Sequence, residues 1–145
     1  MTIYDPTALR RELHEMPELA LHEKRTSAYV AEKLKALGIE THENVGGSTG
    51  VVGIIRGTEP GPVFMLRADM DALPIAEATG AAFASIHPGK MHACGHDGHM
   101  AMALAAATYV DRTIREQPGA IRRNVLFVFQ PAEETTGGAK TVCES

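Results

Sequence analysis

The sequence is poor in the features that mark secreted, nucleic-acid-binding and membrane-spanning proteins. Its 145 residues include two cysteines, Cys94 and Cys143, too few for a disulfide framework and consistent with a reducing compartment. The formal net charge of −4 provides no basic surface for nucleic acid or an acidic membrane. No apolar run approaches the ~18 residues that a spanning helix needs, and the first residues do not resemble a signal peptide. We therefore expect a cytoplasmic protein that binds neither nucleic acid nor membrane.

What the sequence does contain is the composition of a globular domain. Hydrophobic residues make up 44% and charged residues 22%, and the length suffices for one buried core. Apolar periodicity, with glycine and proline at the breaks, predicts helices alternating with strands, which is typical of an α/β layered fold. Helices are predicted at 7–16, 23–37 and 100–114, and strands at 39–44, 51–56, 63–67 and 125–129.

Three further predictions concern how these elements begin, pair and pack. Asp5 is expected to cap the first helix, with Pro6 at its first position. Strands 51–56 and 63–67 are expected to be neighbours in a hairpin or meander. The strand at 125–129, Val-Leu-Phe-Val-Phe, is apolar on both faces and is expected in the middle of a sheet covered by helices.

The segment Met91–His99, Met-His-Ala-Cys-Gly-His-Asp-Gly-His, is the densest cluster of metal-binding side chains in the sequence. It holds three of the seven histidines and one of the two cysteines. Cys94 and His96 are two residues apart, so both side chains can face one point in an extended or turning segment. Thiolate and imidazole bind zinc, cobalt or manganese. The segment therefore predicts a metal site, against the alternative of a chance cluster of histidines.

Two more polar motifs each follow a predicted strand: one contains Asp69 and Asp71, the other Glu133 and Glu134. Sites in open α/β sheets lie outside the carboxyl ends of the strands, so we expect both motifs to meet the histidine-rich segment. Two adjacent glutamate side chains repel each other, and partial burial without a partner for their charges would destabilise the fold. A metal can bind one of them, and the other can accept a proton from a metal-bound water. For the pair alone, a solvated loop is the alternative.

The remaining polar residues of these segments leave several interpretations open. Asp69 and Asp71 face the same side of an extended strand, where one use is to orient a ligating histidine through its second ring nitrogen. The alternative is an aspartate pair that caps a turn. Asp97 can equally cap the helix that begins there. His92 and His99 receive no assigned role.

Taken together, these motifs resemble those of a known family. Residues 67–75 (Arg-Ala-Asp-Met-Asp-Ala-Leu-Pro-Ile), 91–99 and 130–134 (Gln-Pro-Ala-Glu-Glu) resemble the M20 metallopeptidase/amidohydrolase family, and residues 10–19 resemble its opening. They are most similar to the branch that contains hippurate hydrolases, N-acyl-amino-acid amidohydrolases and plant auxin-conjugate hydrolases. The resemblance covers essentially the whole chain and rests on three ordered motifs.

The resemblance implies a hydrolase that uses two divalent metal ions to cleave the amide bond of N-acyl amino acids, hippurate-like or related conjugates. Manganese or zinc is expected, with nickel or cobalt as alternatives. Asp69 occupies a position where the wider family has a ligating histidine; in this branch a cysteine supplies that ligation, so Asp69 receives no role. Carried over by motif, the metal ligands are Cys94, His96 and Glu134, the general base toward a metal-activated water is Glu133, and the carboxylate that orients a ligand is Asp71.

The resemblance also implies a three-layer αβα, zinc-peptidase-like catalytic domain, of which residues 1–145 form the amino-terminal part. The expected second domain, which serves dimerisation and closes over substrate, is absent from this sequence, as are further histidine ligands. The full-length protein is expected to be a homodimer or homotetramer. The isolated chain is expected to bind metal weakly, to hydrolyse little and to expose an apolar sheet face.

Two rival interpretations come from other classes of protein. A thiol hydrolase would use Cys94 as nucleophile and His96 or His99 as base, but it leaves both carboxylate pairs without a function. A non-catalytic interpretation treats the chain as a truncated fragment that acts only as a folding or assembly module. Metal dependence of activity separates the first rival from the metallohydrolase, and assays on the chain and a longer product separate the second.

Overall fold

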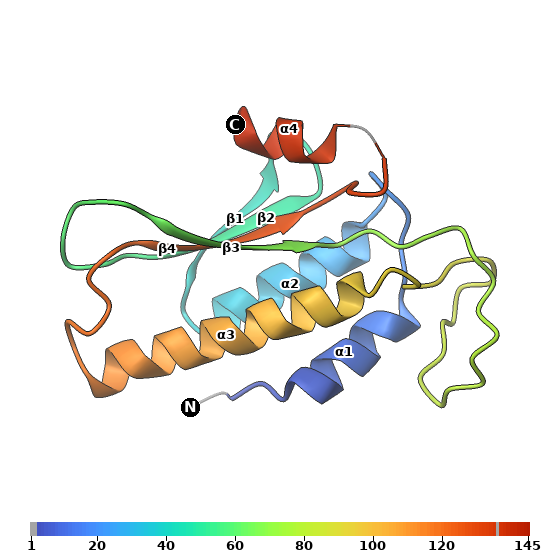
Figure 1. Ribbon diagram of the computed structural model, residues 1–145, viewed down its shortest axis with the longest axis horizontal. Coiled ribbons are helices and arrows are strands. Elements are labelled where there is room, and N and C mark those ends of the chain that lie inside the picture. The colour runs from blue at the N-terminus through green and yellow to red at the C-terminus, as the bar shows by residue number, and fades with distance from the viewer. Residues whose placement is uncertain (1–2, 136) are drawn as a thin grey trace.

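In the computed structural model, residues 3–135 and 137–145 are described, and they form a four-stranded sheet with helices on both faces (Figure 1). Helices α2 and α3 lie against one face, α1 packs on α3 on the same side, and α4 lies over the other face, so the predicted αβα class is confirmed. In chain order the elements are α1 (Pro6–Glu15), α2 (Lys24–Ala36), β1 (Glu40–Val45), β2 (Gly50–Ile55), β3 (Phe64–Asp69), α3 (His96–Glu116), β4 (Val125–Gln130) and α4 (Gly138–Cys143).

The prediction that strands 51–56 and 63–67 pair with each other is wrong. The sheet order is β1-β2-β4-β3, with β4 antiparallel to β2 and parallel to β3. The strand apolar on both faces takes the interior of the sheet, as expected, because there both of its faces and both of its edges are covered. Since β4 separates β2 from β3, the connection between those strands must pass over the residues that lead into β4.

Gly57 allows this close passage. A Cβ atom at this position would lie 2.3 Å from the carbonyl oxygen of Arg122, so a larger residue would force the two backbones apart. The Gly57 N–H donates to Asn124 Oδ1 at 2.9 Å, which fixes the crossing point. The sequence signals at Gly57 and in the following Pro-Gly-Pro segment therefore mark a crossing connection rather than a hairpin turn.

The helices on the first face form where the sequence predicts them. The Asp5 carboxylate accepts a hydrogen bond from the Thr7 N–H at 2.9 Å and so caps α1, which begins at Pro6. Leu13 of α1 and Leu104 of α3 are fully buried in the core with the β4 side chain Phe127. Burying each such side chain contributes about 1.5–3 kcal/mol to the free energy of folding.

The fold brings one end of β3, one end of β4 and the start of α3 together. Strands β3 and β4 run parallel with Asp69 opposite Gln130, and α3 connects them, so both carboxyl ends reach the same edge of the sheet (Figure 1). Helix α4, which the sequence does not predict, follows Gly137 at a positive φ of 107°. None of the helices described here has the length and apolar character to cross a bilayer.

Candidate metal centre

The two strand ends and the start of α3 bring the three predicted motifs together. Strand pairing continues one residue beyond β3, where the Met70 N–H donates to the Gln130 carbonyl at 2.9 Å. This contact sets Asp71 beside the loop that follows β4. His96 is the first residue of α3, and it is buried beside the two strand ends, with only 2% of its surface exposed. The sequence expectation that the motifs meet at the carboxyl ends of the strands is confirmed.

Cys94, His96 and Glu134 each direct one donor atom toward a common point. The sulfur, the ring nitrogen and the carboxylate oxygen all lie within 4.8 Å of one another. The Nε2 atom of His96 is 3.7 Å from Glu134 Oε1. These are the three residues expected as ligands from the sequence, and residues from two separate segments supply them.

The hydrogen bond of His96 Nδ1 determines which ring nitrogen is available to a ligand. Nδ1 lies 2.8 Å from the backbone carbonyl oxygen of Asp71, and a carbonyl can only accept, so Nδ1 carries a hydrogen. Nε2 then faces the acidic groups of the site, including Glu133 Oε2 at 3.7 Å. Burial by itself lowers the pKa of His96, but hydrogen bonding to Asp71 and the charge of Asp69 outweigh it and raise the pKa to about 8.

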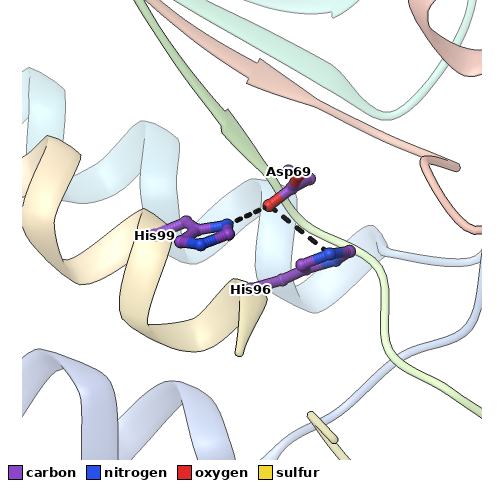
Figure 2. A group of neighbouring side chains, drawn as sticks. All are labelled: Asp69, His96 and His99. Carbon is purple, nitrogen blue, oxygen red and sulfur yellow. Dashed lines mark hydrogen bonds and ion pairs between the residues drawn. The ribbon is translucent and has the colours of Figure 1, made fainter. Parts of the chain in front are cut away.

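A second group of possible ligands shares His96 (Figure 2). Asp69 Oδ1 lies 2.6 Å from His99 Nδ1 and 3.6 Å from His96 Nε2, and the two imidazole rings stack with centroids 5.7 Å apart. Asp69 is thus at the same site as Asp71, as the two-residue spacing predicts. The sequence assigned no role to Asp69 or His99, and here they form a hydrogen-bonded pair beside the expected ligands.

Asp71 contacts the loop that carries the two glutamates rather than serving as a turn cap. Its Oδ1 accepts a hydrogen bond from the Glu133 N–H and its Oδ2 accepts one from the Glu134 N–H, both at 2.9 Å. Burial raises the pKa of this carboxyl, but hydrogen bonds from His96 and from these two backbone groups more than compensate, and the pKa falls below its usual value. Asp71 therefore orients both His96 and the glutamate pair.

The environment of Cys94 is the opposite of what a nucleophilic cysteine needs. A hydrogen bond with Glu134, then burial, then the charges of Glu134, Glu133 and Asp69 raise the pKa of the thiol to about 11. Reactive cysteines lie beside positive groups that lower the thiol pKa. The surrounding acids thus disfavour the thiolate that a thiol hydrolase needs, whereas a cation bound between them would favour it.

The donor set fits a divalent metal ion. Thiolate, imidazole and carboxylate ligands converge from Cys94, His96 and Glu134, and further acids surround them. Such a group of anions repels itself in the absence of a cation, and mixed sulfur, nitrogen and oxygen ligation suits zinc and its neighbours.

Asp97 belongs to a separate buried network and does not cap α3. The N-cap residue of α3 is Gly95, and Asp97, which is fully buried, accepts hydrogen bonds from His14 Nδ1 at 2.7 Å and Arg10 Nε at 3.1 Å. His92 lies next to this network, and burial lowers its pKa to about 4. Within the described part of the chain, neither ring nitrogen of His92 has a hydrogen-bond partner.

Sequence reasoning missed one buried carboxylate at the site. Glu23, predicted simply as the start of the second helix, is 0% exposed and accepts a hydrogen bond from the Ala132 N–H at 2.9 Å. The two residues are 109 positions apart, so no local pattern reveals the contact.

Comparison with known families now identifies the group to which these motifs belong. The sequence model of peptidase family M20/M25/M40 matches residues 65–145, more than half of the chain and all three polar motifs. The chain belongs to this family. The resemblance seen in the sequence is therefore confirmed.

Relatives within the M20 family are similar over nearly the whole chain. An N-acetyldiaminopimelate deacetylase from Listeria monocytogenes is 47% identical over 138 residues, which cover 95% of this chain and 36% of the relative. Thermostable carboxypeptidase 1 from Saccharolobus solfataricus is 50% identical over 139 residues, covering 94% and 34%. The crystal structure of a dinuclear metal-binding M20 peptidase from Bacillus subtilis superposes with a TM-score of 0.87 at 42% identity, covering 96% and 38%. The chain thus spans about a third of the length of these relatives.

Proposed function

We propose that this chain forms the amino-terminal part of the catalytic domain of a metal-dependent amidohydrolase that acts on N-acyl amino acids. The observation that carries the proposal is the convergence of donor atoms from Cys94, His96 and Glu134 within 4.8 Å of one another, with Glu133 adjacent. Membership of the M20 family supports it. The cytoplasm as its location, and a homodimer or homotetramer as the full-length assembly, remain parts of the proposal.

The proposed cofactor is a pair of divalent ions, supported by the dinuclear metal-binding relative from Bacillus subtilis. Cys94, His96 and Glu134 would supply part of the ligand shell, and the choice between manganese, zinc, nickel and cobalt is left to metal analysis. Bound divalent ions polarise a carbonyl group and lower the pKa of a water molecule toward ~7.

Within this proposal, the residues of the chain move one proton. The Glu133 carboxylate accepts the proton of the attacking water and then delivers it to the nitrogen of the departing amine. Asp71 holds the backbone of Glu133 and Glu134 and thereby fixes where both carboxylates lie. The Nδ1 hydrogen bond to the Asp71 carbonyl keeps His96 Nε2 directed into the site.

The substrate is proposed to carry a small acyl group, such as acetyl, on an amino acid with a free carboxylate. A relative named as an N-acetyldiaminopimelate deacetylase and another named as a carboxypeptidase support this class. Neither name refers to a hippurate-type substrate, so benzoyl conjugates become the second choice. A screen of N-acetyl against N-benzoyl amino acids on the full-length protein decides between them.

The direct test is Glu133→Gln in the full-length protein, with Glu134→Gln as the matched neighbour. We expect Glu133→Gln to keep its metal and to lose about 10²–10⁴-fold in kcat, the usual contribution of a general base. Glu134→Gln should lose metal as well as activity, because it removes a donor atom. Elemental analysis and steady-state kinetics measure both effects. Full activity in Glu133→Gln would show that another group is the base.

A further inference from the structure

The loop after β4 is held by two buried carboxylates from distant parts of the chain. Three consecutive N–H groups, those of Ala132, Glu133 and Glu134, each donate to a carboxylate oxygen at 2.9 Å. Asp71 accepts two of these hydrogen bonds and Glu23 accepts the first. We propose that Glu23 is a positioning residue that fixes the glutamate loop, residues 131–134, in the geometry needed for metal binding.

The side chain of Glu23 is committed to this loop and not to its own helix. Glu23 occupies the N-cap position of α2 but makes no side-chain hydrogen bond to that helix. Its Oε1 binds the Ala132 N–H and its Oε2 accepts a hydrogen bond from Thr49 Oγ1 at 2.7 Å. A fully buried carboxylate is costly unless it is hydrogen-bonded, and here both oxygens have partners outside the helix. A residue that served only as a helix cap would not need to bury its carboxylate in this way.

The backbone of Ala132 explains why an acceptor is needed at this point. Ala132 has a positive φ of 51° and is 1% exposed. A left-handed conformation costs a residue with a Cβ atom about 1–2 kcal/mol, so surrounding contacts must hold it. Ala132 lies beyond the end of β4, and the carboxylate of Glu23 supplies the acceptor for its N–H. The next two residues are Glu133 and Glu134, so a change at Ala132 moves both.

Removing the Glu23 acceptor should therefore loosen the loop while leaving the rest of the fold in place. Asp71 would still hold Glu133 and Glu134, but the buried Ala132 N–H would lack a partner and the left-handed backbone would relax. The carboxylate of Glu134 would then leave the position in which its oxygen meets His96 and Cys94. The metal-binding part of this inference rests on the proposed function, whereas the order of the loop does not.

The experiment compares Glu23→Ala and Glu23→Gln with the control Glu18→Ala in the 145-residue chain. Glu18 also lies near the start of α2, where its Oε2 binds the N–H and the hydroxyl of Thr26, both at 2.9 Å. Hydrogen exchange of the backbone amides, followed by NMR without metal, reports the order of the loop. Zinc affinity, measured by competition with a chelator, reports the consequence for the site.

We expect Glu23→Ala to increase amide exchange at Ala132, Glu133 and Glu134 and to weaken zinc binding about 10–100-fold, as is typical when a residue supporting a ligand is lost. Glu23→Gln keeps an acceptor oxygen, so its zinc affinity should lie near that of the unaltered chain, with faster exchange confined to Ala132. Glu18→Ala should leave loop exchange and zinc affinity unchanged.

Wild-type exchange at Ala132 in both Glu23 variants would overturn the inference. If Glu23→Ala does not fold, Glu23→Leu takes its place, because leucine fills similar volume and offers no acceptor; unchanged exchange at Ala132 in that variant would contradict the positioning role. Altered loop exchange in the variants, together with no metal bound by the unaltered full-length protein, would support the positioning role and contradict the proposed function instead.

Discussion

Adjacent residues at the start of α3 serve different parts of the molecule. His96 turns toward the strand ends and the acidic groups there, whereas Asp97 turns toward α1 and its partners Arg10 and His14. Successive residues of a helix point about 100° apart, so this division follows from helical geometry. The first turn of α3 therefore connects the candidate metal centre to the packing of α1.

Substitution of Asp97 tests this connection at the level of one residue. Asp97→Ala removes a fully buried acceptor and leaves His14 Nδ1 without its 2.7 Å partner, which should lower the free energy of unfolding by about 1–3 kcal/mol. Asp111→Ala is the control on the same helix, because its partner Arg115 is exposed, and we expect it to cost less than ~1 kcal/mol. Urea unfolding of both variants without metal measures the difference. Equal costs would contradict a structural role for the network.

What the sequence reveals at this scale depends on how far apart the interacting residues are. The ligands expected at Cys94, His96 and Glu134 lie within recognisable motifs, and their donor atoms do converge. Glu23 acts on Ala132 from a helix start that carries no distinctive pattern. A contact across 109 residues depends on the folded chain, so periodicity and spacing cannot show it.

Among the elements, α3 bears both the site and a large part of the core. Its first residue is the candidate ligand His96, and its buried face continues through Met100, Leu104 and Ala107 against the sheet. The sequence pattern predicts this helix correctly, but β2 and β3, which the pattern predicts to pair, are separated by β4. Apolar periodicity identifies each element. The order of strands depends instead on which strand gains the most free energy from burial in the interior of the sheet.

A pair of substitutions in α3 separates buried from exposed positions. Leu104 is fully buried, so Leu104→Ala should create a cavity and cost about 2–5 kcal/mol of unfolding free energy. Met102, on the same helix, is 61% exposed, and Met102→Ala should change stability by less than about 0.5 kcal/mol. Thermal or urea unfolding measures both. A small effect of Leu104→Ala would mean that α3 does not pack on the sheet as described.

Across the whole molecule, the two faces of the sheet are covered unequally. Helices α1, α2 and α3 lie on one side of the sheet and only the short helix α4 lies on the other (Figure 1). Between α4 and the sheet is a groove of about 810 Å³, lined by residues that include Val52, Met65 and Leu126. On the edge strand β3, the apolar residues Met65 and Phe64 are exposed over 60% and 61% of their surface. An exposed apolar edge of this kind favours association between chains.

This distribution predicts that the 145-residue chain self-associates through the β3 edge. Met65→Lys adds a charge at that edge and should shift the weight-average mass in sedimentation experiments toward the monomer. Met102→Lys places the same charge on exposed α3 and should leave association as in the unaltered chain. Association unaffected by Met65→Lys would show that another surface is responsible.

Cobalt substitution tests whether Cys94, His96 and Glu134 bind one cation together. Cobalt(II) coordinated by a thiolate gives a sulfur-to-metal charge-transfer band in the near ultraviolet. The two cysteines of the chain provide the comparison, since both are exposed and only Cys94 lies beside His96 and Glu134. We expect the band in the unaltered chain and in Cys143→Ser, and its loss in Cys94→Ser. A band that persists in Cys94→Ser, or never forms in the full-length protein, would contradict shared binding of a cation by these three residues.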